Sequence, residues 1–515
     1  MKVLLVAPPR RLWPFMNEQD NFLMPQALAC IAAVLREDGV DVEVIDCMAE
    51  KVGWRALEQR IRDARPQLVA AGENHATYAS EVIRLVELVK SVDPQIVTVL
   101  GGGHFTNVGH LYLGKHPIDF IVRAEGEITM RELVRALDGG DPDRAYAENG
   151  LSYWRDGEVV YTPPRALVEN LDDLPLPAYD LMPMRQYGKA KYLFSGGGTT
   201  IHHSRGCPAR CSFCVWWTQD AVRKVQVDSK TGCRQEILAP KWRSKSPERT
   251  LEEIDILYRS YDKKCLIFTD PTFNVDPDWS DRFAEALIAR NYDLDWFAFV
   301  RADFILRDHK NGVMEKLVKS GLAHVCIGVE RAEDEQLGDW RKKFYSNSRT
   351  TETFAVLKQH YPQVFRQATF IVGERDETRE SMQRQLEFAK LLDPDYPAFH
   401  PLTPFPGTAV YDEALQKGWL EIEDFDYFDL NTPVMRSKSL SREDIEREII
   451  RLNKSYVSLR WFVRGILSSS KYRRNMYVWW LLVMLKILAA STVRFENPLT
   501  GTRYTGLIEP AWYRT

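Results

Sequence analysis

Three cysteines lie within eight residues near the middle of the 515-residue chain, at Cys207, Cys211 and Cys214. Their spacing is C-x3-C-x2-C, and they directly follow a segment that we expect to be a strand. Cysteine thiolates are the usual protein ligands of iron–sulfur clusters. Because a cubane cluster has four irons, three thiolates leave one iron without a protein ligand. The trio therefore predicts a 4Fe-4S cluster with one open position, which can hold a substrate or a cofactor.

A structural zinc site is the alternative interpretation of these cysteines. Such sites have four protein ligands, and no second C-x2-C pair lies nearby. His202, His203 or Cys233 would have to supply the fourth ligand. Three cysteines at this spacing, within a frame of alternating strands and helices, favour the iron–sulfur cluster.

The composition is that of a globular protein, with 45% hydrophobic and 27% charged residues. The formal net charge of −4 argues against nucleic acid as the main partner. The eight cysteines are too sparse for a secreted disulfide scaffold, and the close trio indicates a metal site in a reducing compartment. The N-terminus lacks the length and cleavage pattern of a signal peptide, so we expect a cytoplasmic protein.

The arrangement of apolar runs predicts an α/β protein with three parts and a connector. Residues 1–140 alternate strands and helices, which predicts a doubly wound, Rossmann-like parallel sheet with helices on both faces. Residues 141–195 are rich in turns and are the expected connector. Residues 196–410 repeat strand–helix units in the pattern of a full or partial TIM barrel. Helical patterns dominate the C-terminal region, residues 411–515.

The cysteine motif resembles that of the radical S-adenosylmethionine (SAM) superfamily. The resemblance implies that SAM binds the open iron through its amino and carboxylate groups. It also implies that an electron from the cluster cleaves SAM to a 5′-deoxyadenosyl radical, while the protein positions the reactants. Segments at the ends of several later strands resemble the corresponding segments of the same family. One difference is Pro271, which stands where the family usually has the second of two paired acidic residues. The cofactor contacts expected here are Phe213, Asp270, Arg301, Gly328 and Glu330. Ordinary ion pairs that cap strand ends are the alternative for the charged members.

Two loops of the N-terminal domain also carry a resemblance. Gly101-Gly102-Gly103-His104 and Arg123–Glu127 each follow an expected strand, and glycine lets the backbone approach a ligand closely. The G-x-G-x-x-G dinucleotide fingerprint is absent. Before a radical SAM motif, these loops resemble the cobalamin-binding domain of class B radical SAM enzymes. The expected cobalamin contacts are Asn74, His75, Gly101, Gly102, Gly103, His104, Glu125, Gly126 and Glu127.

The group that faces the lower side of the cobalt of cobalamin is open to three interpretations. The motif D-x-H-x-x-G, which supplies a cobalt ligand in other cobalamin proteins, is missing. His75 lies in the loop that faces the lower side of the corrin in related enzymes. It could ligate cobalt, bind a water there, or pack against the ring.

The domain order is closest to the branch that contains the anaerobic magnesium-protoporphyrin IX monomethyl ester cyclase. Asn431–Met435 contributes to this similarity, whereas Arg10–Asn21 differs from the corresponding loop. The branch implies either methyl transfer from methylcobalamin to an unactivated carbon, which we favour, or oxidation with ring closure. A tRNA methylthiotransferase would carry a further cysteine trio, but the N-terminal domain has only Cys30 and Cys47. A corrinoid carrier would leave the cluster motif without a purpose.

The tail and two tryptophans bear on the substrate. Basic residues over 454–474 precede the apolar stretch Met476–Leu485, which is too short to span a bilayer and suits an interfacial helix. A helix that covers the barrel mouth is the alternative. Membrane contact would favour a lipophilic small molecule, such as a tetrapyrrole or polycyclic lipid. Trp216 and Trp217 could line the substrate cavity or pack in the core. The resemblance also implies an electron donor such as flavodoxin or ferredoxin.

Overall fold

The computed structural model describes residues 1–12, 23–140, 142–189, 197–227, 234–342, 345–492 and 507–515. Cys233 and most of the Arg10–Asn21 loop lie outside these residues. Within them, the doubly wound sheet, the partial barrel and the helical tail that the sequence predicts are confirmed.

The N-terminal sheet has the strand order β2-β1-β3-β4-β5-β6-β7. Its first five strands are parallel, and the order reverses beside β1, which is where open sheets of this kind bind ligands. The strands are β1 (Lys2–Ala7), β2 (Asp41–Asp46), β3 (Leu68–Gly72), β4 (Val97–Gly101), β5 (Phe120–Val122), β6 (Leu151–Arg155) and β7 (Glu158–Tyr161). The helices are α1 (Gln26–Glu37), α2 (Cys47–Glu50), α3 (Trp54–Ala64), α4 (Ala79–Val92), α5 (Gly102–Val108), α6 (Glu127–Asp138) and α7 (Pro142–Ala147).

The antiparallel hairpin β6–β7 extends this sheet into residues that the sequence analysis assigns to the connector. Its turn residues, Asp156 and Gly157, both have positive φ, as a two-residue type I′ turn requires. The connector therefore begins structurally as a continuation of the first sheet.

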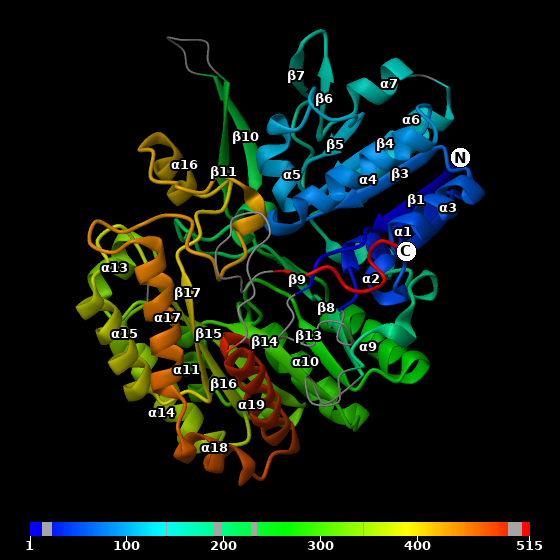
Figure 1. The fold of residues 1–515 in the computed structure, drawn as a ribbon. Coiled ribbons are helices and arrows are strands. Elements are labelled where there is room, and N and C mark those ends of the chain that lie inside the picture. Colours follow the sequence, from blue (N-terminus) through cyan, green and yellow to red (C-terminus); the bar gives the residue numbers. More distant parts are fainter. Residues whose placement is uncertain (13–22, 141, 190–196, 228–233, 343–344, 493–506) are drawn as a thin grey trace.

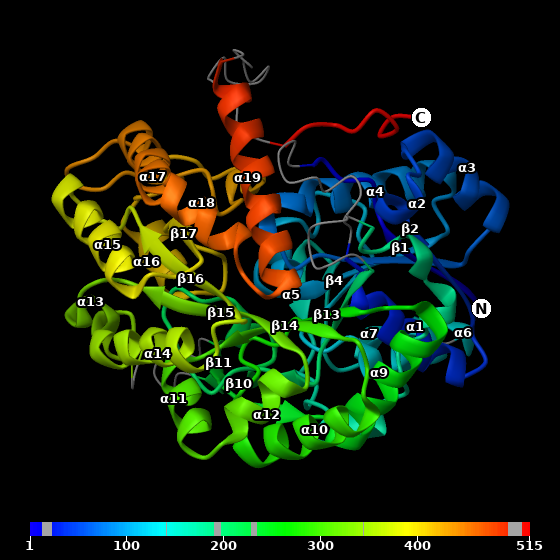
Figure 2. The same ribbon diagram turned by 90° about the horizontal axis from the view of Figure 1, so that it is seen from below.

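The second sheet has six parallel strands in sequential order from β8 to β17. They are β8 (Gly198–Ile201), β13 (Cys265–Phe268), β14 (Asp295–Val300), β15 (Leu322–Glu330), β16 (Phe365–Val372) and β17 (Tyr396–Pro401). The associated helices are α9 (Pro247–Tyr261), α10 (Pro277–Arg290), α11 (Ala302–Lys310), α12 (Val313–Lys319), α13 (Asp334–Asp339), α14 (Asn347–His360), α15 (Arg379–Leu392) and α16 (Ala409–Gln416). Figures 1 and 2 show these helices outside a curved sheet, as in a partial barrel.

Two short strand pairs follow β8 and flank the cysteine motif. β9 (Ser204–Arg205) pairs with β12 (Arg243–Ser244), and β10 (Val222–Val227) pairs with β11 (Arg234–Ala239). Figure 1 shows the β10–β11 hairpin projecting beside the N-terminal domain. The strand pattern of the barrel did not reveal these pairs, because they lie outside its strand–helix repeat.

The C-terminal region consists of α17 (Arg442–Tyr456), α18 (Leu459–Ile466) and α19 (Lys471–Thr492). Met476, Tyr477, Trp479 and Val483 of α19 are buried in one cluster with the first residues of the barrel strands, including Cys265 and Phe365. The apolar stretch expected at a membrane or at the barrel mouth therefore covers the opposite end of the barrel. The buried residues Tyr472, Met476, Trp479 and Val483 recur every three or four positions, so they form one apolar helix face that packs against the barrel.

Residues 507–515 return to the N-terminal domain, as Figure 1 shows in red. The carbonyl oxygens of Tyr513 and Thr515 accept hydrogen bonds from the amides of Trp54 and Ala56, at 3.0 and 3.1 Å. These amides belong to the first turn of α3, whose N–H groups have no partner within the helix.

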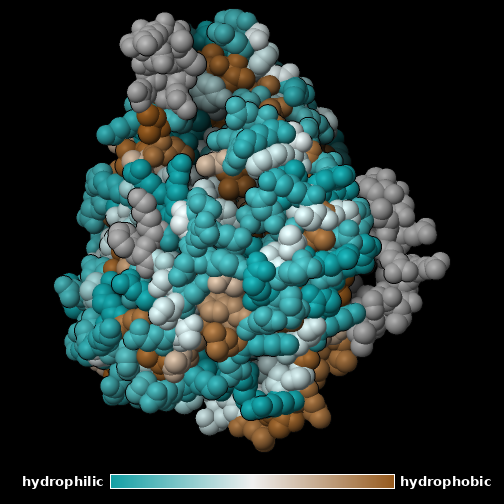
Figure 3. All heavy atoms as spheres, turned by 90° about the vertical axis from the view of Figure 1, so that its left-hand side faces the viewer, coloured by the Kyte–Doolittle hydropathy of each residue, from teal (hydrophilic) through white to brown (hydrophobic). Residues whose placement is uncertain are grey.

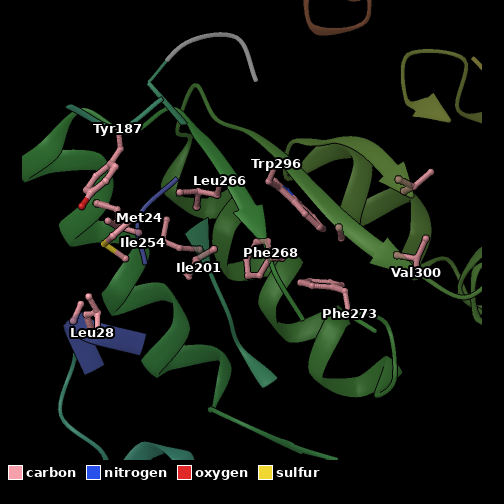
Figure 4. Packing of buried hydrophobic residues seen from close by; sticks show 14 of the residues in the cluster. Met24, Leu28, Tyr187, Ile201, Ile254, Leu266, Phe268, Phe273, Trp296 and Val300 are labelled. Atoms are coloured by element: carbon pink, nitrogen blue, oxygen red, sulfur yellow. The ribbon is translucent and has the colours of Figure 1, made fainter. Parts of the chain in front are cut away.

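One hydrophobic cluster runs through both sheets. Figure 4 shows Met24 and Leu28, at the start of α1, against Ile254 of α9 and Leu266 of the barrel. Tyr187 from the connector completes the junction, and its hydroxyl donates to Asp46 Oδ2 at 2.8 Å. The two sheets are therefore joined by packed side chains rather than by a loose linker.

Candidate active site between the two sheets

The loop that carries the three cysteines begins directly after β9 and leads into α8 (Trp216–Gln219). Gly206 has φ +80°, and a Cβ there would lie 1.9 Å from the carbonyl oxygen of Lys241, so only glycine fits. Cys207 and Cys214 are partly exposed, Cys211 is buried, and all three are free thiols. The loop thus presents three unpaired sulfurs at the carboxyl end of the barrel strands.

The surroundings of these thiols fit an iron–sulfur cluster. Burial raises the pKa of Cys211 and raises that of Cys214 to about 12, so the thiols need a nearby positive charge to become thiolates. The iron ions of a cluster supply that charge. The Cys207 Sγ lies 3.4 Å from the hydroxyl of Thr272. Among the residues described above, no three His, Cys, Asp or Glu side chains are grouped to hold a single metal ion.

Asp270, at the end of β13, faces the segment that enters the cysteine loop. Its Oδ1 accepts hydrogen bonds from the amide and hydroxyl of Ser204, at 2.6 and 2.5 Å. Burial raises its pKa to about 7. His203, which donates its amide to the same carboxylate, is buried and stacked on Trp279 with ring centroids 3.9 Å apart. This geometry positions the loop backbone.

Charged groups at the ends of β14 and β15 lie beside the cysteines. Arg301 makes a bidentate pair with Asp303, with both N–O distances 3.0 Å. Lys342 is buried, and its Nζ lies 2.8 Å from Glu330 Oε1. Although burial acts in the opposite direction, Glu330 raises the pKa of Lys342, so this lysine stays charged. The pair places one positive and one negative charge close to Cys211.

Gly328 and Phe213 complete this part of the site. A Cβ at Gly328 would lie 2.2 Å from Glu330 Oε1, so this glycine makes room for the Glu330–Lys342 pair. Phe213 packs against Trp340, with ring centroids 5.1 Å apart. Lys342 is not among the residues predicted from the sequence, because it follows α13 and the predicted site residues lie at strand ends.

The β3 and β4 loops of the N-terminal domain are locked together. Gly102 has φ +86°, and a Cβ there would lie 2.5 Å from the carbonyl oxygen of Glu73. The amide of Gly103 donates to Asn74 Oδ1 at 2.8 Å, and the amide of His104 donates to the Glu73 carbonyl at 3.0 Å. The expected cobalamin loops therefore form one surface at the carboxyl ends of their strands.

His75 and His104 have different environments. His75 is exposed and meets Trp216 edge-on, with ring centroids 5.6 Å apart. Desolvation by the surrounding protein lowers the pKa of His75, so its ring is neutral and its unprotonated nitrogen can bind a metal ion or accept a hydrogen bond. His104 is 3% exposed, and its Nε2 lies 2.9 Å from the hydroxyl of Tyr112. His104 lies in an aromatic cluster with Phe105, Tyr112 and Phe425 behind the loop surface, and burial there lowers its pKa to about 3.

Buried polar atoms near these loops fit an amide-rich ligand such as cobalamin. Within the described part of the chain, Gln219 Nε2, Asn107 Nδ2 and Thr77 Oγ1 are buried without a hydrogen-bond partner. A Cβ on Gly103 would lie 2.4 Å from Gln219 Nε2, so this amide stands directly against the glycine loop. Buried polar groups are normally satisfied, so such atoms mark a place where a polar ligand is expected.

Glu125 and Glu127 turn toward the barrel domain. Glu125 Oε1 accepts from Arg205 at 3.0 Å, and Arg205 also pairs with Glu127. Although burial acts in the opposite direction, Arg205 holds the pKa of Glu127 below its usual value. Gly126 between them packs against Ile31, 3.2 Å from the position of a Cβ. The position of Arg205, two residues before Cys207, was a signal that sequence analysis could have used.

Comparison with known proteins agrees with this architecture. A B12 binding domain model matches residues 15–134, and the Radical SAM superfamily model matches residues 201–389. The fold is similar to that of the radical S-adenosylmethionine methyltransferase TsrM from Kitasatospora setae, with a TM-score of 0.68 and 15% identity. That likeness covers 95% of this chain and 99% of TsrM. The fold and the site together define a cobalamin-dependent radical SAM enzyme.

Similar proteins of known sequence define the family of this chain more narrowly. It is 31% identical to an uncharacterized methyltransferase of Pyrococcus horikoshii over 461 residues, which covers 89% of this chain and 92% of the relative. It is 29% identical to the anaerobic magnesium-protoporphyrin IX monomethyl ester cyclase of Rubrivivax gelatinosus, over 90% of this chain and 79% of the cyclase. The chain belongs to the cobalamin-dependent radical SAM family of methyltransferases and related cyclases. A 4Fe-4S cluster, SAM and cobalamin are its cofactors.

Proposed function

We propose that the enzyme methylates an unactivated carbon of a small molecule by a radical route. When bound, the cluster and SAM supply a 5′-deoxyadenosyl radical, and cobalamin supplies the methyl group. The observation that carries the proposal is the position of α8, which continues from the cysteine loop and brings Trp216 to His75 and Gln219 to Gly103. The cluster loop and the cobalamin loops therefore face one reaction space.

The chain's own residues have separate tasks in this proposal. Cys207, Cys211 and Cys214 hold the cluster, while Lys342 and Glu330 bind the charged end of SAM. The glycine loop at 101–103 and the amide of Gln219 would bind cobalamin. Neutral His75 would lie near the bound corrin and could accept a hydrogen bond from water there.

Anaerobic turnover with SAM tests the reaction type. The methyl group of SAM is isotopically labelled, and a solvent extract of the host cells serves as the source of substrate. Methylation should give S-adenosylhomocysteine together with 5′-deoxyadenosine and a labelled product. Formation of 5′-deoxyadenosine without matching S-adenosylhomocysteine would instead support oxidation with ring closure, the second candidate, which the similarity to the cyclase favours.

We propose in addition that the cluster receives its electron from a flavodoxin or ferredoxin. Partial exposure of Cys207 and Cys214 supports an external donor, because an electron must reach the cluster from outside the fold. Chemically reduced flavodoxin should generate the reduced-cluster EPR signal in the holoenzyme. Reduction by dithionite alone, with none by either protein donor, would contradict this choice.

We further propose that α18 touches an anionic membrane and that the substrate is lipophilic. Leu459 and Leu467 are 79% and 77% exposed, and Val463 and Ile466 extend the same face. Three arginines of this region, Arg451, Arg464 and Arg473, pair with carboxylates of the protein. Lys454, Arg460 and Lys471, by contrast, are exposed on and beside α18, which suits contact with anionic lipid headgroups. Figure 3 shows an apolar patch at the lower edge of this side of the molecule, where α18 lies in Figure 1. No helix in the described residues is long and apolar enough to cross a membrane.

Liposome flotation tests the membrane contact. The full chain should float with vesicles that contain phosphatidylglycerol and remain at the bottom with phosphatidylcholine alone. The double variant Leu459→Glu, Leu467→Glu should lose flotation. Leu391→Glu is the matched control, because Leu391 is 67% exposed on α15, and it should float like the parent. Flotation of the double variant would refute the contact.

A further inference from the structure

A buried group of charges connects the N-terminal domain to the residue that leads into the cysteine loop. Arg205 lies two residues before Cys207, and its side chain is only 12% exposed. Its Nη1 donates to Glu125 Oε1 at 3.0 Å and to Glu127 Oε2 at 3.3 Å, and its Nη2 donates to Glu127 Oε1. We call these three residues the Glu125–Arg205–Glu127 clamp.

Both carboxylates of the clamp are themselves fixed in place. Glu127 is the first residue of α6, where the helix N-terminus stabilises negative charge. Glu125 accepts from Arg243 Nη1 and from the amide of Val168, both at 2.8 Å. Arg243 lies opposite Arg205 in the β9–β12 pair. The β9–β12 pair is thus tied by both arginines to the segment Glu125–Glu127, which leads into α6.

The neighbouring residues are held from the barrel side. Ser204 donates to Asp270, and the amide of Gly206 donates to Asp220 Oδ2 at 3.2 Å. Arg205 therefore links two bodies, because its own strand is fixed to the barrel and its side chain to the N-terminal domain. Separating the clamp would leave buried charges without partners, which is strongly unfavourable.

We propose that the Glu125–Arg205–Glu127 clamp is a positioning device that sets the distance between the cluster loop and the cobalamin loops. This inference rests on the proposed cluster and cobalamin sites. Glu127 begins the helix that follows the β5 loop, and Arg205 precedes the first cysteine, so a shift at the clamp moves one site relative to the other. Radical formation and methyl delivery need both sites at a fixed separation, because small misplacements of reacting groups cost rate steeply.

Pulsed EPR on the holoenzyme measures that separation without any substrate. The protein is loaded with the cluster and with cob(II)alamin, and the magnetic coupling between the reduced cluster and the cobalt gives their distance. The parent should show one narrow distance distribution. The double variant Glu125→Gln, Glu127→Gln should show a broadened or displaced distribution at unchanged iron and cobalamin content.

Asp38→Asn is the matched control. Asp38 makes a bidentate pair with Arg135 of the same helix α6, at 2.6 and 2.8 Å, but this pair is exposed and lies within one domain. The control should keep the parent distribution. Arg205→Lys retains the positive charge but cannot bind both carboxylates in the same geometry, so its distance distribution should have an intermediate breadth. If the double variant loses iron, Arg205→Lys takes its place in the test.

The possible results separate this inference from the proposed function. An unchanged distance distribution in a clamp variant that retains both cofactors would overturn the positioning role, while methylation could still stand. Absence of iron and acid-labile sulfide in the reconstituted parent would instead remove the proposed cluster site, on which the inference rests.

Discussion

Replacing Gly102 by alanine should damage the cobalamin loops far more than an ordinary glycine substitution. Gly102 has φ +86°, and the new Cβ would lie 2.5 Å from the backbone oxygen of Glu73. An L-residue in the left-handed region costs about 1–2 kcal/mol. Forcing a methyl group against packed backbone costs about 1–3 kcal/mol more. We therefore expect the free energy of unfolding to fall by about 2–5 kcal/mol.

Gly39→Ala separates the two contributions. Gly39 has φ +74° in the same domain, but a Cβ there would meet nothing within 4 Å, so only the backbone cost applies. Urea unfolding of both variants should place Gly102→Ala below Gly39→Ala by the steric contribution of about 1–3 kcal/mol. Titration with hydroxocobalamin, followed by absorbance, should show weaker binding only for Gly102→Ala. Equal losses of stability in the two variants, with equal cobalamin affinity, would refute the reasoning.

Three further predictions concern buried charges and the cluster. Asp395→Asn should lower stability by about 3–5 kcal/mol in urea unfolding, because Arg366 and Arg473 would lose their buried carboxylate partner. Asp270 has a folded-state pKa of about 7, above its usual value. Its contribution to the stability of the apo-protein is therefore greatest below about pH 4 and declines as the pH rises to 7. In Asp270→Asn, the melting temperature should no longer show this decline between about pH 4 and pH 7. The triple alanine variant of the cluster cysteines should contain no iron or acid-labile sulfide after reconstitution and should not cleave SAM, and cleavage at the parent rate would contradict the cluster assignment.

The features that could be predicted from the sequence are those that depend on residues close together along the chain. Alternating apolar runs specify the two parallel sheets, and the spacing of Cys207, Cys211 and Cys214 needs no tertiary information. The glycine loop at 101–103 is predictable in the same way, because three consecutive glycines directly after a strand indicate that the backbone there comes close to another group.

Contacts between distant segments could not be predicted in the same way. Glu125 and Glu127 look like ligand contacts from their place after a strand, but a partner such as Arg205 becomes visible only when the two domains are packed together. The stretch Met476–Leu485 is apolar enough for either a membrane surface or a protein core, and hydrophobicity alone does not say which surface covers it. The structure places most of it against the barrel, whereas Leu459 and Val463 of α18 are exposed.

The continuous core through both sheets has a consequence for how the enzyme can be handled and how it can move. Met24 and Leu28 in the N-terminal part share one apolar interior with Ile254 and Leu266 of the barrel. Dividing the gene at the connector would expose complementary apolar surfaces on both protein fragments, so the fragments should aggregate when they are expressed separately. For the same reason we expect cobalamin to enter through local rearrangements of surface loops, because a hinge motion that separates the two halves would expose this shared core to water.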